Sequence, residues 1–142
     1  NWWTPEDLAK FKTKTKLIVD QYSKFKVGDK NVNGDATQGE NIADLGGVVM
    51  GYEAFKKTKQ YKTNEKISGL NPDQRYFLAY GYAWMVNTNK EALAQQVMTD
   101  VHSPAQFRIN GPLANIPEFY KAFNIKKGSP MYQDEKLKVV IW

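Results

Sequence analysis

Apolar residues near the start of the chain recur at steps of three, four or seven, which is the spacing of one face of an α-helix. This stripe contains Leu8, Phe11, Ile18, Tyr22 and Phe25. Thr4 is a typical N-cap and Pro5 is favoured in a first turn, so the pattern predicts a helix that begins at these residues. We expect this helix to end at Gly28, and residues 30–38 are polar enough to form a loop.

A second apolar stripe predicts a helix over residues 40–57. Gly46 and Gly47 lie inside this segment, and each glycine costs about 1 kcal/mol relative to alanine in a helix interior. We therefore expect another backbone or a ligand to approach the helix closely at these glycines. We also expect the apolar face around Val48 and Tyr52 to pack against protein that lies outside this chain.

Four further helices are predicted to begin near Asn71, Glu91, Ser103 and Asn115. Asn71 and Ser103 each precede a proline and stand three residues before a glutamine, which is the pattern of a capped helix start. Only the C-terminal stretch KLKVVIW has the composition of an extended segment. The sequence thus predicts a mostly α fold that forms a single helical unit.

Composition narrows the possible partners of this unit of 142 residues. The net charge is +5, but the lysines are scattered and no nucleic-acid-binding motif accompanies them, so we expect solvated helix faces and no nucleic acid. The absence of cysteine excludes disulfides and thiolate metal sites. No apolar run approaches the roughly 18 residues of a membrane-spanning segment. The chain begins Asn1-Trp2-Trp3 without a methionine, so we expect it to be a piece of a longer protein.

Two acidic residues interrupt the apolar run GENIADLGG at residues 39–47. Glu40 and Asp44 are four positions apart, so a helix would place both on one face, beside apolar neighbours. A partly buried carboxylate needs a cation, a metal or several hydrogen-bond donors. One interpretation is a first-turn acid at Glu40 and an ion pair between Asp44 and a lysine. The other is a metal site in which Glu40 is a ligand and Asp44 orients a neighbouring ligand.

A second candidate site is the stretch DVHSPAQFR at residues 100–108. His102 is the single histidine of the chain, and Asp100 could accept the proton of its Nδ1 atom and so fix the tautomer. Arg108 follows on the next predicted helix. An oriented imidazole and a guanidinium near a buried pair of acids could stabilise a polarised carbonyl group. The alternatives are a structural histidine and an ion pair between Arg108 and an acid such as Glu118 or Asp100.

Together, GENIADLGG and DVHSPAQFR resemble the zinc metallopeptidase family of neprilysin. The order of the surrounding segments is also similar, with NWWT before the two motifs, FLAYGYAW between them and Trp142 at the end. The resemblance covers Asn1 to Trp142. It implies that residues 1–142 are the C-terminal part of a thermolysin-like (gluzincin) peptidase catalytic domain, a part that would be mostly α.

The resemblance also implies roles for individual residues. In this family, zinc is held by two histidines of an HExxH helix and by a glutamate, and Glu40 resembles that third ligand. Asp44 resembles the acid that steadies a ligand histidine. His102 resembles the hydrogen-bond donor to the tetrahedral oxyanion, and Asp100 resembles the residue that orients it.

Two residues resemble the substrate-binding positions of the family. Arg108 resembles the arginine that binds a backbone carbonyl of the substrate. Trp84 stands where the family has a tryptophan at the pocket for the primed side of the substrate. The implied activity is zinc-dependent cleavage of oligopeptides before bulky apolar residues.

The chain departs from the family pattern because it contains no HExxH motif. It cannot supply the other two zinc ligands, so we expect an upstream part of the catalytic domain as a partner. We also expect the isolated chain to be inactive and to bind zinc weakly. The missing cysteines suggest a bacterial relative, and the family implies an extracytoplasmic location. The alternative function is a catalytically silent helical interaction module with a peptidase-like sequence.

Overall fold

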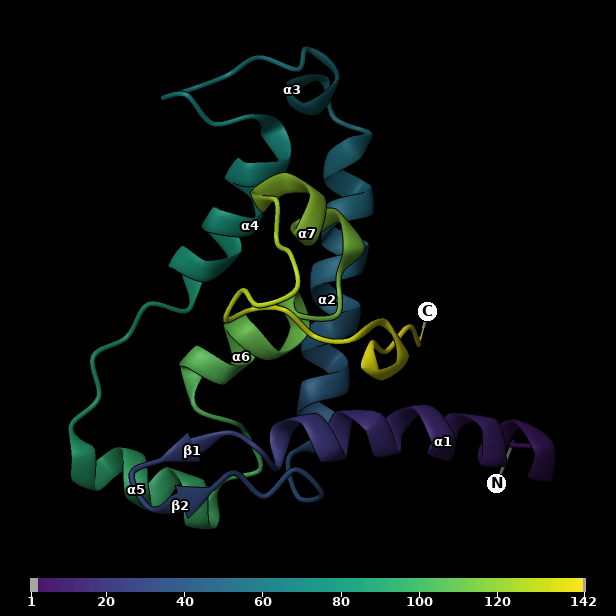
Figure 1. Cartoon of the computed structure of the whole chain (residues 1–142), viewed down its shortest axis with the longest axis vertical. Helices are drawn as coiled ribbons and strands as arrows, with labels where there is room; N and C mark the ends of the chain where they lie inside the picture. Colours follow the sequence, from purple (N-terminus) through teal and green to yellow (C-terminus); the bar gives the residue numbers. More distant parts are fainter. Residues whose placement is uncertain (1–2, 142) are drawn as a thin grey trace.

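The computed structural model describes residues 3–141, and within this range the chain is mostly helical, as predicted (Figure 1). The elements in chain order are α1 (Pro5–Tyr22), β1 (Lys26–Val27), β2 (Lys30–Asn31), α2 (Gln38–Lys56), α3 (Lys59–Lys62), α4 (Pro72–Ala83), α5 (Lys90–Thr99), α6 (Ala105–Leu113), α7 (Pro117–Phe123) and the 3₁₀ turn η1 (Glu135–Leu137). None of the described helices is long and apolar enough to cross a membrane.

The predicted caps explain where two of these helices begin. The hydroxyl oxygen of Thr4 accepts a hydrogen bond of 3.1 Å from the backbone N–H of Asp7 at the start of α1. Asn71 and Gln74 form a reciprocal capping box at the start of α4. The predicted cap at Ser103 is wrong, because Pro104 takes the N-cap position of α6 and Ser103 bonds elsewhere.

Two segments outside the helices differ from the prediction. Lys26–Val27 and Lys30–Asn31 pair as a small antiparallel hairpin, where the sequence suggested a helix end and a loop. Gly28 closes the turn with a φ of 60°, a left-handed conformation that glycine adopts without strain. The C-terminal residues up to 141 pair with no strand of the described chain, and the 3₁₀ turn η1 replaces part of the expected extended segment.

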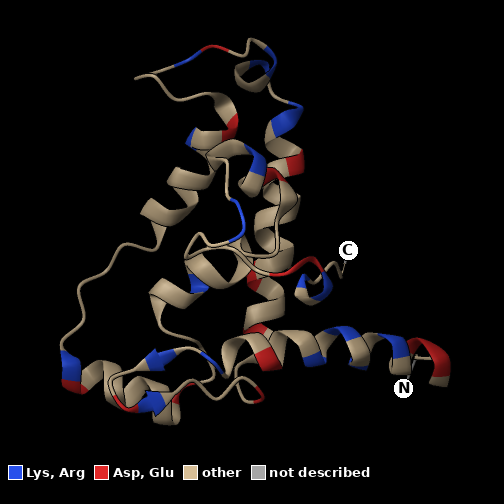
Figure 2. Ribbon diagram, viewed as in Figure 1, with Lys and Arg blue, Asp and Glu red and all other residues tan. Residues whose placement is uncertain are grey.

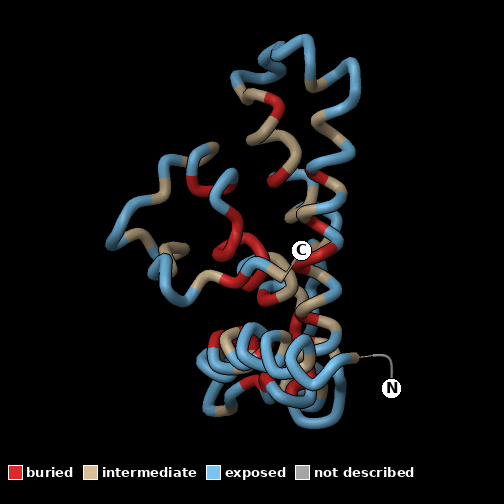
Figure 3. Tube along the Cα trace, turned by 90° about the vertical axis from the view of Figure 1, so that its right-hand side faces the viewer, coloured by how far each residue is buried: buried red, intermediate tan, exposed pale blue. Residues whose placement is uncertain are grey.

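Helix α2 is the centre of the fold (Figure 1). Helix α1 crosses near its N-terminal end, α6 packs along its middle, and α4 and α7 pack together beside its C-terminal half. The buried segments gather in the middle and at the base of the molecule, and the outlying loops are mostly exposed (Figure 3). Aromatic rings fill much of this core; Tyr52 stacks on Phe77 at 5.2 Å between ring centroids, and Phe25 stacks on Phe107 at 4.6 Å.

The two glycines predicted to be approached closely differ, because Gly46 is buried and Gly47 is not. Gly47 is exposed, and no atom lies within 4 Å of the place where a Cβ would stand. Val48 and Tyr52 are already buried by this chain, so they do not form the exposed face that we expected to pack against outside protein. One turn after Gly47, a Cβ on Gly51 would lie 2.6 Å from the hydroxyl of Tyr76, so the helix is closely approached there.

Large exposed apolar side chains lie instead on the outer side of α4. Leu78, Tyr82 and Met85 are 47%, 75% and 71% exposed, respectively. They border a groove of about 850 Å³ between α4, α6 and α7 that is lined almost entirely by apolar residues. Part of the apolar surface that this chain leaves uncovered is therefore on α4 and the residues just after it, while other exposed apolar side chains, such as Met50 and Met98, lie on α2 and α5.

Candidate functional site

The two sequence motifs meet in space. Helix α2 supplies Glu40 from its first turn and Asp44 from its second, while the segment before α6 supplies Asp100 and His102, and α6 itself supplies Arg108. Glu40 and His102 are 62 residues apart in sequence, yet their side chains are in contact. The packing of α6 along α2 brings these five side chains into one cluster.

His102 lies between two carboxylates. Its Nδ1 atom is 2.9 Å from Oδ1 of Asp100, and its Nε2 atom is 3.2 Å from Oε2 of Glu40. Asp100 also accepts a 2.8 Å hydrogen bond from the backbone N–H of His102, and these two bonds lower the pKa of the Asp100 carboxyl. The side chains of His102 and Glu40 are 41% and 42% exposed, so both can reach a ligand from solvent. The expected contact between Asp100 and the Nδ1 atom of His102 is present.

Asp44 has a different environment from Glu40. Its two carboxylate oxygens accept hydrogen bonds from Nε and Nη2 of Arg108, each 2.7 Å long, so the pair is bidentate. The Asp44 side chain is 9% exposed and that of Arg108 is 17% exposed. The suggestion of a lysine partner for Asp44 is therefore wrong, as is the suggestion of Glu118 or Asp100 as the partner of Arg108. Hydrogen bonding to Asp44 raises the pKa of Arg108 further above its ordinary value, so this side chain is charged.

Two aromatic residues of α4 and its C-terminal cap hold Arg108 from the other side. The guanidinium lies over the ring of Trp84, 4.0 Å from the ring centroid, where the face of the indole attracts a cation. The hydroxyl of Tyr80 donates a 2.8 Å hydrogen bond to the backbone carbonyl of Arg108. With Nε and Nη2 bound to Asp44, the remaining nitrogen, Nη1, makes no hydrogen bond to any residue between 3 and 141.

Sequence reasoning missed the buried polar residues beneath this cluster. Ser103 donates from its hydroxyl to Oδ1 of Asn41 at 2.9 Å, and both side chains are fully buried. The local signal at Ser103 was that of a helix cap, and nothing near it in sequence indicates a partner on α2. The bond from Tyr80 to the backbone of Arg108 was also missed, because the two residues are 28 positions apart in sequence.

The cluster alone does not complete a metal site. Among residues 3–141, no group of three or more His, Cys, Asp or Glu side chains is arranged to hold a metal ion. Asp100 is engaged by His102, and Asp44 is engaged by Arg108. Glu40, in contrast, is half exposed, has no Lys or Arg partner among these residues, and has the hard oxygen atoms that zinc accepts. The residues present therefore fit zinc to the extent that Glu40 could supply one ligand.

A small cavity lies beside Arg108. It has a volume of about 360 Å³ and is bordered by the loop between α4 and α5 and by the start of α6. Trp84, Leu93 and Pro104 supply apolar walls, and Arg108 supplies a charged group at its edge. A side chain of a bound peptide could enter this cavity while its backbone contacts Arg108.

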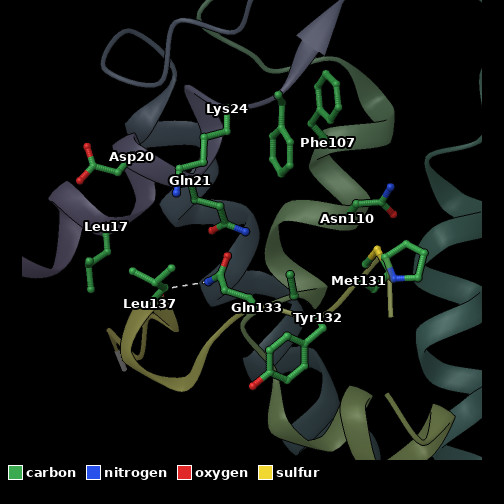
Figure 4. A pocket seen from close by; sticks show the side chains of 13 residues that line it. Leu17, Asp20, Gln21, Lys24, Phe107, Asn110, Met131, Tyr132, Gln133 and Leu137 are labelled. Carbon is green, nitrogen blue, oxygen red and sulfur yellow. Dashed lines mark hydrogen bonds between the residues drawn. The ribbon is translucent and has the colours of Figure 1, made fainter. Parts of the chain in front are cut away.

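A larger pocket elsewhere in the fold is lined by no histidine or arginine. It has a volume of about 430 Å³ between α1, α6 and the C-terminal segment (Figure 4). Gln133 in its wall donates to the backbone carbonyl of Leu137 at 2.9 Å and to the side chain of Asn115 at 2.8 Å. Asp20, its one acid, is paired with Lys16. Asp20, Gln21 and Gln133 are therefore all engaged in structural contacts.

The basic residues are spread over several elements (Figure 2). On α1, Lys10 pairs with Glu6 at 2.6 Å and Lys16 pairs with Asp20 at 2.9 Å, one helical turn apart in each case. All four lysines of this helix (Lys10, Lys12, Lys14 and Lys16) are exposed, as expected for a solvated helix face.

Comparison with known proteins places nearly the whole chain in one family. The model of peptidase family M13 matches residues 1–139. The chain is 38% identical to Neprilysin-2 of Drosophila melanogaster over 98% of its length, and 37% identical to Neprilysin of Homo sapiens, also over 98%. It covers 19% of each of these relatives, so it spans about a fifth of their length. These relatives are animal proteins, and the suggestion of a bacterial source is not supported.

Solved structures show the same fold. Zinc metalloprotease Zmp1 of Mycobacterium tuberculosis, in complex with an inhibitor, superposes with a TM-score of 0.89 at 30% identity. PepO from Lactobacillus rhamnosis superposes with a TM-score of 0.85, also at 30% identity. Both matches cover 100% of this chain, and 23% and 21% of the respective neighbours.

Proposed function

Because the chain belongs to peptidase family M13, we propose that it is the C-terminal part of the catalytic domain of a zinc-dependent endopeptidase. The parent protein would hydrolyse peptide bonds of oligopeptides before bulky apolar residues, in an extracytoplasmic location. The observation that carries this proposal is the convergence of Glu40, His102 and Arg108, from two distant motifs, on one accessible cluster. The remaining zinc ligands would come from the upstream part of the same domain.

Glu40 is the residue of this chain that would hold the metal. Its position in the first turn of α2 is favourable for a carboxylate, and its half-exposed oxygens can reach a cation shared with another segment. When bound, zinc supplies a Lewis acid and lowers the pKa of a coordinated water toward neutrality. Neither Asp100 nor Asp44 is free to replace Glu40, because each is bound to a partner of its own.

His102 would donate a hydrogen bond to the oxyanion of the tetrahedral intermediate. Its Nδ1 atom faces Asp100 and its Nε2 atom faces Glu40, so the ring is placed between two carboxylates. Asp100 holds the Nδ1 proton and fixes the ring. With Glu40 holding a metal, Nε2 of His102 would be the ring nitrogen that faces the substrate.

Arg108 would bind a backbone carbonyl of the substrate through Nη1. Asp44 fixes the plane of the guanidinium through two hydrogen bonds, and Trp84 supports it from one face. Each Asp44 oxygen retains a lone pair, so Asp44 could also accept a hydrogen bond from a ligand histidine of the upstream part. The cavity beside Trp84 would receive an apolar side chain on the primed side of the substrate.

The test uses the full-length protein and three single substitutions. Glu40→Gln should abolish both stoichiometric zinc, measured by atomic emission, and peptide cleavage. His102→Ala should retain zinc but lower kcat by about a hundred- to a thousandfold with little change in KM, because one oxyanion donor is lost. Glu91→Gln, a first-turn acid of α5 that is exposed, is the matched control and should change neither quantity.

The result also separates the two candidate functions. A wild-type protein that contains no zinc and cleaves no peptide would be the silent interaction module, and the peptidase proposal would fail. Retention of full zinc content and activity by Glu40→Gln would remove Glu40 from the metal site.

A further inference from the structure

A chain of buried hydrogen bonds runs beneath the candidate site. The Ser103 hydroxyl donates to Oδ1 of Asn41 at 2.9 Å, and Nδ2 of Asn41 donates to the Thr37 hydroxyl at 2.9 Å. The Thr37 hydroxyl in turn donates to the backbone carbonyl of Asn33, also at 2.9 Å. The exposed fractions of Ser103, Asn41 and Thr37 are 1%, 1% and 3%. This series of hydrogen bonds joins the segment before α6 to the first turn of α2.

Two residues of this series of hydrogen bonds are sequence neighbours of the proposed site residues. Asn41 follows Glu40, and Ser103 follows His102. Successive residues of a helix point about 100° apart, so Glu40 can face solvent while Asn41 enters the core. Ser103 is likewise buried while the preceding His102 is 41% exposed. The Asn41–Ser103 bond therefore joins the backbones that carry Glu40 and His102.

The other contacts of His102 are weaker constraints on its position. Its ring contacts are to Asp100 and Glu40, whose side chains are 41% and 42% exposed, and water competes for such bonds. Among residues 3–141, the one donor to its backbone carbonyl is Gln96, through a long bond of 3.5 Å. A bond between two fully buried groups is far less open to such competition.

We infer that Ser103 and Asn41 are positioning residues that fix His102 relative to Glu40. This inference rests on the proposed function, because it gives His102 and Glu40 their roles. Asn41 lies within a continuous helix, whereas Ser103 lies in the non-helical segment before α6, so loss of the bond should move His102 and leave Glu40 in place. A misplacement of about 1 Å at a reacting group can lower a rate about a hundredfold.

The first experiment is Ser103→Ala in the full-length protein. We expect kcat to fall about ten- to a hundredfold, while KM and the zinc dissociation constant, measured by chelator competition, stay within about twofold. Binding of a phosphonate peptide, whose tetrahedral oxygens resemble the oxyanion, should weaken by about the same factor as kcat. Tyr120→Phe is the matched control, because it also removes a buried hydroxyl, one that donates to the carbonyl of Ala114 at 2.8 Å and lies away from the site.

A second variant separates positioning from stability. The double variant Asn41→Leu/Ser103→Ala replaces both bonded groups by apolar ones, so no unsatisfied acceptor remains between them and most of the stability should return. We expect its kcat to stay low, because the connection between the two segments is still missing. Recovery of kcat together with stability would overturn the inference, as would a Ser103→Ala protein with normal kcat and normal phosphonate affinity. A wild-type protein without zinc or activity would instead overturn the proposed function, and the inference with it.

Discussion

The ion pair between Arg108 and Asp44 changes what removal of Arg108 should do. Without this pair, Arg108→Met would be expected to weaken substrate binding and leave the fold unchanged. In the structure, the substitution leaves the Asp44 carboxylate only 9% exposed and without its cation. Loss of one partner of a buried pair costs about 3–5 kcal/mol, and partial exposure of Arg108 reduces this to about 2–3 kcal/mol. The melting temperature should therefore fall by several degrees.

The same substitution should also raise KM. A hydrogen bond from a charged donor contributes about 1.5–3 kcal/mol, which corresponds to a factor of about ten or more in affinity. Because Arg108 would bind a carbonyl away from the scissile bond, it would stabilise the bound substrate and the transition state alike. Interactions of that kind affect KM more than kcat.

A double substitution distinguishes the two effects. Asp44→Asn/Arg108→Met removes the isolated charge as well as the guanidinium, so it should recover most of the melting temperature while KM stays high. The assay is steady-state cleavage of a peptide by the full-length protein, with a melting curve for each variant. If the double variant regains a normal KM, or if Arg108→Met melts early with an unchanged KM, then Arg108 holds the fold and not the substrate.

Two further predictions concern the chain itself. Calorimetric titration with zinc at neutral pH should show no sub-micromolar site, because Glu40 supplies too few ligands; tight binding that disappears on Glu40→Gln would contradict this. Burial raises the pKa values of Tyr22 and Tyr80 above the usual value of about 10, so the unfolded chain loses these protons first and stability should fall as pH rises above about 10. Melting temperatures that stay constant from about pH 9 to about pH 11 would refute the second prediction.

Local sequence patterns correctly predicted the features that depend only on residues close together in sequence. Thr4 and Asn71 cap their helices as predicted, because a cap involves residues only three positions apart. The hairpin at residues 26–31 was missed, because strands of two residues are too short to show alternation, and Gly28 was the one available signal. Val139 lies outside any strand. Its backbone N–H donates to Oδ1 of Asn115 at 3.0 Å, and no local pattern indicates that partner.

The candidate site also combines local features, which the sequence predicted, with long-range contacts, which it did not predict. Helical spacing correctly placed Glu40 and Asp44 on one helix, but it could not distinguish them. Their environments differ because Arg108 lies 64 residues from Asp44 and His102 lies 62 residues from Glu40. The sequence around Ser103 predicts a helix cap. In the structure, the Ser103 hydroxyl instead forms a buried hydrogen bond to Asn41.

Contacts within this chain would orient the proposed substrate-binding groups before a metal binds. Each exposed group that we propose to act on substrate is held by contacts within this chain, since Asp100 orients His102 and Asp44 orients Arg108. Donors held in place before reaction cost little reorganisation when charge develops. The groups proposed to contact substrate would therefore not depend on zinc for their orientation. Glu40 is the exception, because its only ion-pair contact among the described residues is the 3.2 Å contact to His102, and it can exchange that contact for a cation.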